Sequence, residues 1–113
     1  MTEGPVVKRF GQIIGVDPAQ FEKYKAYHAA VWPEILAMIK ACNIENYSIF
    51  HKDGQLFAYM EYTGNDFAAD MAKMAADPKT QEWWDVMMPM QRPVANRAPG
   101  EWWATMEEVF HLD

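Results

Sequence analysis

The stretch Ile44–Tyr62, "IENYSIFHKDGQLFAYMEY", decides the fold. Two runs rich in aromatic and β-branched residues flank Asp53-Gly54, a pair that tolerates the positive φ angles of a tight turn. This pattern predicts an antiparallel hairpin with strands near residues 45–51 and 55–62.

The segment before the hairpin predicts one strand and two helices. Residues 6–16, "VVKRFGQIIGV", are rich in β-branched residues and predict a strand in which Gly11 is a candidate for a bulge. In "DPAQ", Asp17 is the expected N-cap, with Pro18 at the first helical position and Gln20 in the reciprocal capping place. We expect this helix to run to about residue 30.

Pro33 disfavours helical geometry at the residue before it, so the helix is expected to break near residues 30–32. A second helix is then predicted through "PEILAMIKAC", residues 33–42, where the apolar residues recur at core spacing.

The segment after the hairpin predicts a second helical region and a final strand. Asn65 or Asp66 can cap a helix over residues 67–76, which pauses at Asp77-Pro78 and continues over residues 79–90. The proline-rich stretch 91–101, "QRPVANRAPGE", predicts a loop. Alternation from Met106 to Leu112 predicts a last strand.

The expected order is therefore β-α-β-β-α-β within a single domain, residues 1–113. This order is typical of the ferredoxin-like α+β fold, a four-stranded antiparallel sheet with helices on one face. The other sheet face would be left open to water. Because 14% of the residues are aromatic, we expect that face to be covered by a second subunit, giving a homodimer.

Charge and composition narrow the function classes. A net charge of −6 and a pI near 4.9 argue against binding to nucleic acid or to an anionic membrane surface. The N-terminus lacks the apolar core of a signal peptide, and no apolar run reaches the roughly 20 residues that span a bilayer. Cys42 is the single cysteine, which fits a reducing compartment. We expect a cytoplasmic protein.

Tyr24 and His28 are the first candidates for chemistry. Four residues apart on a helix, they project from the same stripe, which Phe21 and Val31 direct inward. Packing is the commoner role for such a histidine. However, a helix break at Trp32-Pro33 would open a gap beside His28, and a histidine in a gap titrates near the pH at which acid–base catalysis is most effective.

Three further aromatic residues fit a binding cleft. Tyr47 lies on the strand that follows the helices, and Trp83-Trp84 is an adjacent pair on a predicted helix. Neighbouring helical residues diverge by about 100°, so at least one indole should line a cleft or an interface. Aromatic faces suit the C–H face of a sugar ring, whose hydroxyls can bond indole N–H and phenol O–H groups. Sheet packing is the simpler role for Tyr47.

The remaining polar candidates have weaker patterns. His51 and His111 lie near strand ends, and no catalytic role is expected for either. Glu61, Glu107 and Glu108 are expected on a solvated face. The three histidines share no metal-ligand spacing, and neither HExxH, CxxC, a P-loop nor GxGxxG occurs. We therefore expect neither a metal nor a cofactor.

Five blocks carry a resemblance to a known family. "YKAYHAAVWPEI", "ENYSIF", "FAYMEY", "QEWWDVMMPM" and "MEEVFHLD" occur in the order and spacing of the L-rhamnose mutarotase family, over nearly the whole chain. The His-x-x-x-Trp-Pro-Glu segment and the Trp-Trp pair are the most specific parts. The resemblance implies a homodimer of the dimeric α/β-barrel type that interconverts the α and β anomers of a 6-deoxy sugar.

The resemblance also implies roles for single residues. The family's catalytic histidine falls on His28, its sugar-binding tyrosines fall on Tyr24 and Tyr47, and its indole pair falls on Trp83 and Trp84. The chain departs from the family's frequent Asn-Pro after the histidine, because it has Ala29-Ala30 there. This departure leaves the choice between L-rhamnose, L-fucose and related 6-deoxyhexoses open.

Mutarotation needs one proton on the ring oxygen and the loss of another from the C1 hydroxyl. Our hypothesis is that His28 supplies the ring-oxygen proton, while water or a carboxylate is the base. Two alternatives stay open: a small ferredoxin-like dimeric monooxygenase that holds an aromatic substrate, and a non-catalytic sugar-binding module.

Overall fold

The predicted hairpin forms in the computed structural model, which describes residues 7–113. Strands β2 (Ile44–Lys52) and β3 (Gln55–Tyr62) pair antiparallel. Asp53 and Gly54 have φ angles of 50° and 77°, the left-handed backbone that a two-residue hairpin turn of this kind requires. Asp-Gly therefore sets the hairpin as the sequence predicts.

Strand β1 (Lys8–Val16) pairs antiparallel with β3 in a continuous register, from Lys8 opposite Tyr62 to Gly15 opposite Gln55. Val7 precedes the strand, and residue 6 of the predicted range lies outside the described residues. The regular register shows that the bulge considered at Gly11 is absent. A register shift instead occurs in β2, between Glu45 and Ser48.

The C-terminal part of the sheet differs from the prediction. The stretch 91–101 begins with a short strand, β4 (Gln91–Arg92), and the last strand is β5 (Ala104–Met106); both pair with β1. The prediction of a strand over Met106–Leu112 is wrong, because residues 107–113 have no strand structure. Alternation of apolar and polar residues shows only that a segment has an apolar face. A strand also needs a neighbouring strand to pair with, and alternation does not show whether one is present.

The first helical region divides as Pro33 predicts. Helix α1 (Phe21–Ala29) ends before the break, and α2 (Pro33–Ala41) begins with the proline in its first turn. The predicted N-cap is wrong. Asp17 accepts a hydrogen bond from the Ala19 N–H at 3.0 Å, which closes a turn ahead of the helix, and it also pairs with Arg92 at 3.2 Å. The cap is Gln20, without a side-chain bond.

The second helical region consists of α3 (Phe67–Ala76), α4 (Pro78–Met87) and a 3₁₀ turn, η1 (Met88–Met90). The predicted cap at Asp66 forms, and Asp77, where the sequence predicted a pause, is a second cap. The Asp66 carboxylate accepts from the Ala69 N–H at 3.0 Å, and the Asp77 carboxylate accepts from the Thr80 N–H at 3.0 Å.

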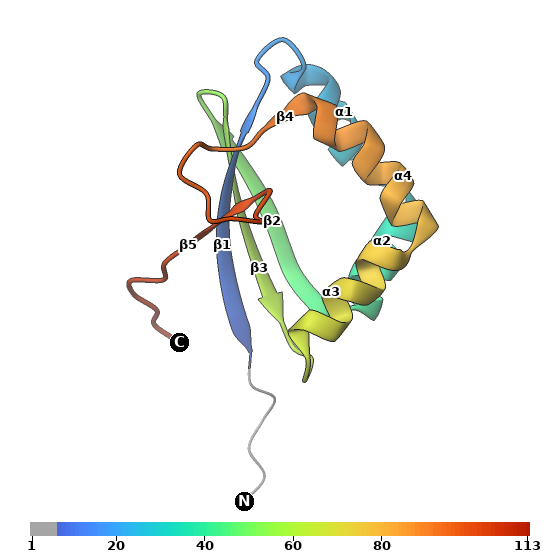
Figure 1. Ribbon diagram of the computed structural model, residues 1–113, viewed down its shortest axis with the longest axis vertical. Helices are drawn as coiled ribbons and strands as arrows, with labels where there is room; N and C mark the ends of the chain where they lie inside the picture. Colours follow the sequence, from blue (N-terminus) through green and yellow to red (C-terminus); the bar gives the residue numbers. More distant parts are fainter. Residues whose placement is uncertain (1–6) are drawn as a thin grey trace, which may run out of the picture.

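The sheet order is β2-β3-β1-β4, with β5 also on β1, so two short strands share the fourth position. This is the predicted ferredoxin-like arrangement, and Figure 1 shows all four helices on one side of the curled sheet. No helix within residues 7–113 is long and apolar enough to cross a membrane.

The buried residues between the two layers form two separate clusters. One surrounds Ile14, Leu56 and Trp83, and the other surrounds Ile44, Met60 and Tyr62. Ile39 of α2 packs against both clusters.

Candidate active site

His28 lies in the last turn of α1, where its orientation is determined by its own helix. Its Nδ1 lies 2.8 Å from the carbonyl oxygen of Tyr24, and its ring stacks on the Tyr24 ring with centroids 4.3 Å apart. The helical spacing of four that the sequence showed therefore places the two side chains in contact. It also leaves Nε2, on the opposite side of the imidazole, directed away from the helix.

Trp83 of α4 packs edge-on against the same imidazole. The ring centroids of Trp83 and His28 lie 5.5 Å apart with an interplanar angle of 70°. Trp83 is held by two further edge contacts, to Tyr27 at 6.0 Å and to Trp32 at 5.1 Å. Because Pro33 breaks the helix, Trp32 lies outside helical geometry and reaches the indole.

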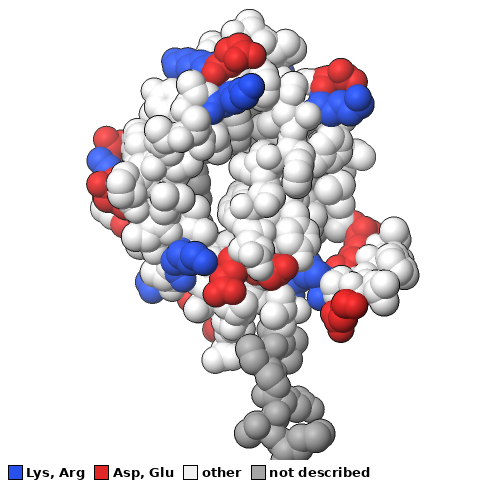
Figure 2. All heavy atoms as spheres, turned by 180° about the vertical axis from the view of Figure 1, so that it is seen from behind, with Lys and Arg blue, Asp and Glu red and all other residues white. Residues whose placement is uncertain are grey.

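A cavity of about 650 Å³ opens between the helices and β2. Its size lies within the range of small-molecule sites. Its aromatic and titratable lining residues are His28, Tyr47, Trp83, Trp84, Lys40 and Glu45. Figure 2 shows the molecule hollowed between its two layers, with the charged side chains gathered toward the ends and edges. The walls are mostly apolar.

Four of the five predicted site residues line this cavity. His28 comes from α1, Tyr47 from β2, and Trp83 and Trp84 from α4. The two indoles differ in solvent exposure, as expected for neighbouring helical residues that point in different directions. Trp83 is 7% exposed and Trp84 is 36% exposed. Trp83 is thus part of the core as well as of the cavity wall, whereas Trp84 presents more of its surface to solvent.

Tyr47 lies within the register shift in β2, between Glu45 and Ser48. Asn46, the residue before it, has a φ of 49°, so the strand is locally twisted where the side chain enters the wall of the cavity. Desolvation, with a smaller contribution from the nearby Tyr24, raises the pKa of Tyr47 to about 12. The phenol therefore keeps its proton at neutral pH and is a hydrogen-bond donor to whatever occupies the cavity.

Tyr24 lies behind His28 and lines a different, smaller hollow of about 230 Å³ next to α1. Its hydroxyl accepts a hydrogen bond from the Gln91 amide at 3.1 Å, and the Gln91 carbonyl oxygen accepts one from the Trp102 indole N–H at 2.7 Å. Burial raises the pKa of Tyr24, while the bond from Gln91 opposes the shift. No local sequence signal indicates this contact across 67 residues.

His28 is neutral in this environment. Desolvation lowers the pKa of its imidazole from the ordinary value, and the hydrogen bond to the Tyr24 carbonyl opposes that shift. A neutral imidazole can both take up and return a proton near neutral pH. The chemical requirement for an acid–base group is therefore met.

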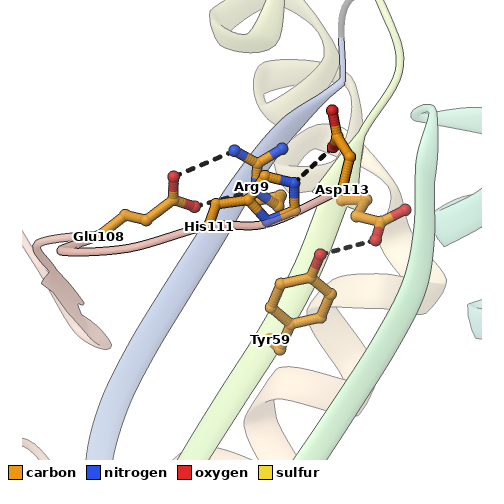
Figure 3. A network of polar contacts seen from close by, with 6 residues as sticks. Arg9, Tyr59, Glu108, His111 and Asp113 are labelled. Atoms are coloured by element: carbon orange, nitrogen blue, oxygen red, sulfur yellow. Dashed lines mark hydrogen bonds and ion pairs between the residues drawn. The ribbon is translucent and has the colours of Figure 1, made fainter.

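His111 and the carboxylates Glu61 and Glu108 do not line this cavity. Figure 3 shows the outer face of the sheet, where Arg9 pairs with Glu108 at 2.9 Å and His111 pairs with Asp113 at 2.7 Å. Glu61 accepts hydrogen bonds from Tyr59 and Asn46, at 2.6 and 2.7 Å, and these bonds lower the pKa of its carboxyl group.

His51 stacks on Phe21 with ring centroids 3.6 Å apart, at the wall of the smaller hollow. Glu107 is exposed. Residues 7–113 contain no group of three His, Cys, Asp or Glu side chains that could hold a metal ion.

Comparison with known proteins agrees with this geometry. The family profile described as L-rhamnose mutarotase matches residues 9–112. The chain belongs to the L-rhamnose mutarotase family. It is therefore an enzyme of the isomerase class, and the resemblance in its five sequence blocks is confirmed.

Two relatives show how far the similarity extends. The L-rhamnose mutarotases of Oceanobacillus iheyensis and Bacillus subtilis are each 34% identical to this chain over 109 residues, which is 95% of this chain and 100% of theirs. The mutarotase family similarity thus spans the whole of both relatives.

Two solved structures share the fold. The L-rhamnose mutarotase of Formosa agariphila superposes with a TM-score of 0.73 at 24% identity, over 94% of this chain and 99% of that one. Tetracenomycin F2 cyclase of Streptomyces glaucescens, a polyketide cyclase, superposes with a TM-score of 0.71 at 14% identity, over 94% and 97%. At these identities the two structures support the fold alone.

Proposed function

We propose that this chain interconverts the α and β anomers of L-rhamnose by acid–base opening and reclosure of the pyranose ring. The observation that carries the proposal is the placement of a neutral imidazole, His28, in a cavity that also contains the Tyr47 phenol and the Trp83 indole. The family assignment of residues 9–112 supports the same reaction.

The reaction suits the residues in the cavity. One proton must reach the ring oxygen and one must leave the C1 hydroxyl, after which the aldehyde rotates and recloses. His28 exchanges a proton with the sugar, and a positioned acid–base group contributes about 10²–10⁴-fold to a rate. Tyr47 orients a hydroxyl, with Tyr24 holding the imidazole from behind. Trp83 and Trp84 lie against the apolar ring face and the C5 methyl group.

The sugar class follows from the apolar walls. A methyl group at C5 is accepted by the indoles and by aliphatic residues such as Ile35 and Ile39, whereas a hydroxymethyl group would be buried there without a partner. We therefore propose 6-deoxyhexoses, with L-rhamnose first and L-fucose as the competitor. Ala29-Ala30, which stands where the family often has Asn-Pro, adjoins His28 at the end of α1.

Saturation transfer between the anomeric protons of L-rhamnose tests the function directly. The wild-type chain should speed anomer exchange well above the buffer rate, and His28→Ala should lose most of that acceleration. L-Mannose, which differs from L-rhamnose only by the C6 hydroxyl, should exchange more slowly than L-rhamnose at equal concentration. Undiminished exchange by a folded His28→Ala protein would remove His28 from the reaction.

Two outcomes of the same experiment would support other functions. Oxygen consumption with a quinol substrate, together with anomer exchange at the buffer rate, would indicate the monooxygenase. Saturable quenching of tryptophan fluorescence by L-rhamnose without faster exchange would indicate a sugar-binding module.

We also infer that the chain is a homodimer that pairs through its outer sheet face. Phe50 of β2 is 64% exposed, and its neighbour Ile49 packs against the core, so strand alternation directs Phe50 to the outer face. Val109, Phe110 and Leu112 of the C-terminal segment are also exposed. In Figure 1 this segment lies on the side of the sheet away from the helices. Glu108 anchors it to Arg9 of β1. Apolar side chains held together in this way favour burial against a second copy.

Sedimentation velocity of the wild type, Phe50→Glu and the control Ala37→Glu tests the dimer. Ala37 is exposed on the helical layer, so both substitutions add one carboxylate to a surface position. Phe50→Glu should shift the protein toward monomer while Ala37→Glu leaves it dimeric. A monomeric wild type at micromolar concentration would refute the interface. Because Cys42 is fully buried and free, a reducing compartment suits the chain, and we propose the cytoplasm.

A further inference from the structure

The hydrogen bond between His28 and its own helix determines which ring nitrogen carries the proton. A backbone carbonyl oxygen only accepts, so Nδ1, 2.8 Å from the Tyr24 carbonyl, must be the donor. A neutral imidazole has one N–H, which leaves a lone pair on Nε2. His28 therefore meets a substrate as a proton acceptor.

The surroundings of His28 keep it in this form. Tyr24 and Trp83 cover two sides of the ring, and no described side chain within residues 7–113 makes an ion pair with it. The titratable groups that line the two hollows beside His28 are Tyr24, Lys25, Lys40, Glu45, Tyr47 and His51. Glu45 and the two lysines are exposed. Desolvation accordingly dominates, and it disfavours the imidazolium.

Tyr47 is the complementary proton donor in the same cavity. Of the other polar lining residues, Thr80 donates its hydroxyl to Asp77 at 2.8 Å and Asn46 donates its amide to Glu61 at 2.7 Å. Lys40 lies exposed at the rim. No hydrogen bond joins the Tyr47 hydroxyl to another described side chain or backbone group, and the residue as a whole is 39% exposed. Desolvation of the phenol raises its pKa to about 12, so it keeps its proton at neutral pH. Its proton is available to a bound sugar.

We propose that His28 begins ring opening as the base, taking the proton of the C1 hydroxyl on Nε2, and that the Tyr47 hydroxyl is the acid that protonates the ring oxygen. This inference rests on the proposed mutarotase function. It reverses the role that the sequence suggested for His28, and it assigns Tyr47 a catalytic role in place of a binding role.

The protons and bonds balance over the cycle. As His28 removes the O1 proton, the O1 electrons form the C1=O1 double bond and the bond between C1 and the ring oxygen breaks. The departing oxygen takes the Tyr47 proton and becomes the C5 hydroxyl. An aliphatic alcohol is a weaker acid than a phenol, even one with a raised pKa, so this transfer is downhill. After rotation about C1–C2, the phenolate takes the C5 hydroxyl proton back, the ring closes, and the imidazolium returns its proton to O1.

The pH dependence of kcat/KM for L-rhamnose, after subtraction of the buffer rate, distinguishes base from acid. If neutral His28 is the reactive form, kcat/KM rises with pH and levels off above the histidine pKa. A profile that instead falls as pH rises through this range would show that the imidazolium is reactive, and it would overturn the inference. A wild-type chain that does not accelerate exchange at any pH would refute the proposed function itself.

Tyr47→Phe tests the acid, with Tyr27→Phe as the matched control. Tyr27 lies on α1 and touches the outer edge of Trp83, so the control also removes one phenol hydroxyl near the site. Tyr47→Phe should lower kcat by about 10²–10⁴-fold with little change in KM, while Tyr27→Phe keeps both. A Tyr47→Phe protein that retains kcat and only raises KM would show that Tyr47 binds the sugar without donating a proton.

A fluorinated tyrosine at position 47 tests the acid through the pH profile of kcat/KM. This profile would not change with fluorination if Tyr47 only supported the structure. Fluorine lowers the phenol pKa, so an alkaline fall in kcat/KM should enter the measurable range and move to lower pH with each added fluorine. The same substitution at position 27 should leave the profile unchanged. An alkaline limb that is independent of fluorination at position 47 would contradict the assignment of the acid. Circular dichroism confirms that each variant is folded.

Discussion

Replacing Trp83 or Trp84 by alanine should lower the free energy of unfolding by very different amounts. Trp83 is 7% exposed and makes edge contacts with Tyr27, His28 and Trp32, whereas Trp84 is 36% exposed. Both residues line the cavity. We expect Trp83→Ala to destabilise the fold strongly and Trp84→Ala to act mainly on the cavity.

The size of the difference follows from the burial. The gap in exposed fraction corresponds to roughly 70 Å² of a tryptophan surface, or about 2 kcal/mol at about 25 cal/mol per Å². The aromatic contacts of Trp83 add about 0.5–1.5 kcal/mol each. We therefore expect Trp83→Ala to lower the free energy of unfolding by about 3–5 kcal/mol, and by at least about 2 kcal/mol more than Trp84→Ala.

Urea unfolding followed by far-ultraviolet circular dichroism measures this difference without relying on the indole signal. With an m-value of about 1.5 kcal/mol/M, the Trp83→Ala midpoint should lie at least about 1 M below that of Trp84→Ala, at equal m-values. Equal midpoints, or a lower one for Trp84→Ala, would refute the assignment of Trp83 to the core. Equal sugar affinity of Trp84→Ala and the wild type would show that the exposed indole does not contact the sugar.

Three further outcomes test the local structure. Burial lowers the pKa of His28 below its ordinary value of about 6.5, so the unfolded state binds more protons than the folded state below that pH. The free energy of unfolding should therefore decline as the pH falls from about 7 to about 5.5. An equal decline in the free energy of unfolding of a His28→Asn protein would contradict this. Asp77→Ala should cost about 1 kcal/mol in urea unfolding, since its carboxylate caps α4 through the Thr80 N–H. Asp85→Ala, in the last turn of the same helix, should cost less, because a carboxylate there caps nothing and opposes the helix dipole. Gly54→Ala should cost roughly 1 kcal/mol because its φ is 77°, and a stability equal to the wild type would refute the strain at this turn.

The cavity is lined by residues of both core clusters, Ile35 and Trp83 from one and Ile44 from the other. Pro33 turns the chain between α1 and α2, so that Trp32 packs on Trp83. Trp83 then becomes the shared boundary of the core and the cavity. A helix break that looks destabilising in isolation is thus the feature that holds the indole beside His28.

The sequence predicted a local element correctly where the residues that determine it are neighbours in the chain. Asp53-Gly54 set the turn, Pro33 set the helix break, and Asp66 capped its helix as expected. The sequence predicted only a pause at Asp77-Pro78, where the structure shows that Asp77 caps α4. The cap at Asp17 failed because the backbone N–H of Ala19 and the side chain of Arg92, across the sheet, compete for the same carboxylate.

The sequence by itself determined the order of strands and helices as far as the last helix, the hairpin and the pairing of Tyr24 with His28 on one helical stripe, because turn geometry and helical periodicity act between neighbours. Only the tertiary structure decided that Tyr47 faces the same cavity as His28 while Tyr24 lies behind it, held by Gln91. It also decided that the last strand stops at Met106. These outcomes depend on which distant backbone lies alongside, and no local pattern contains that information.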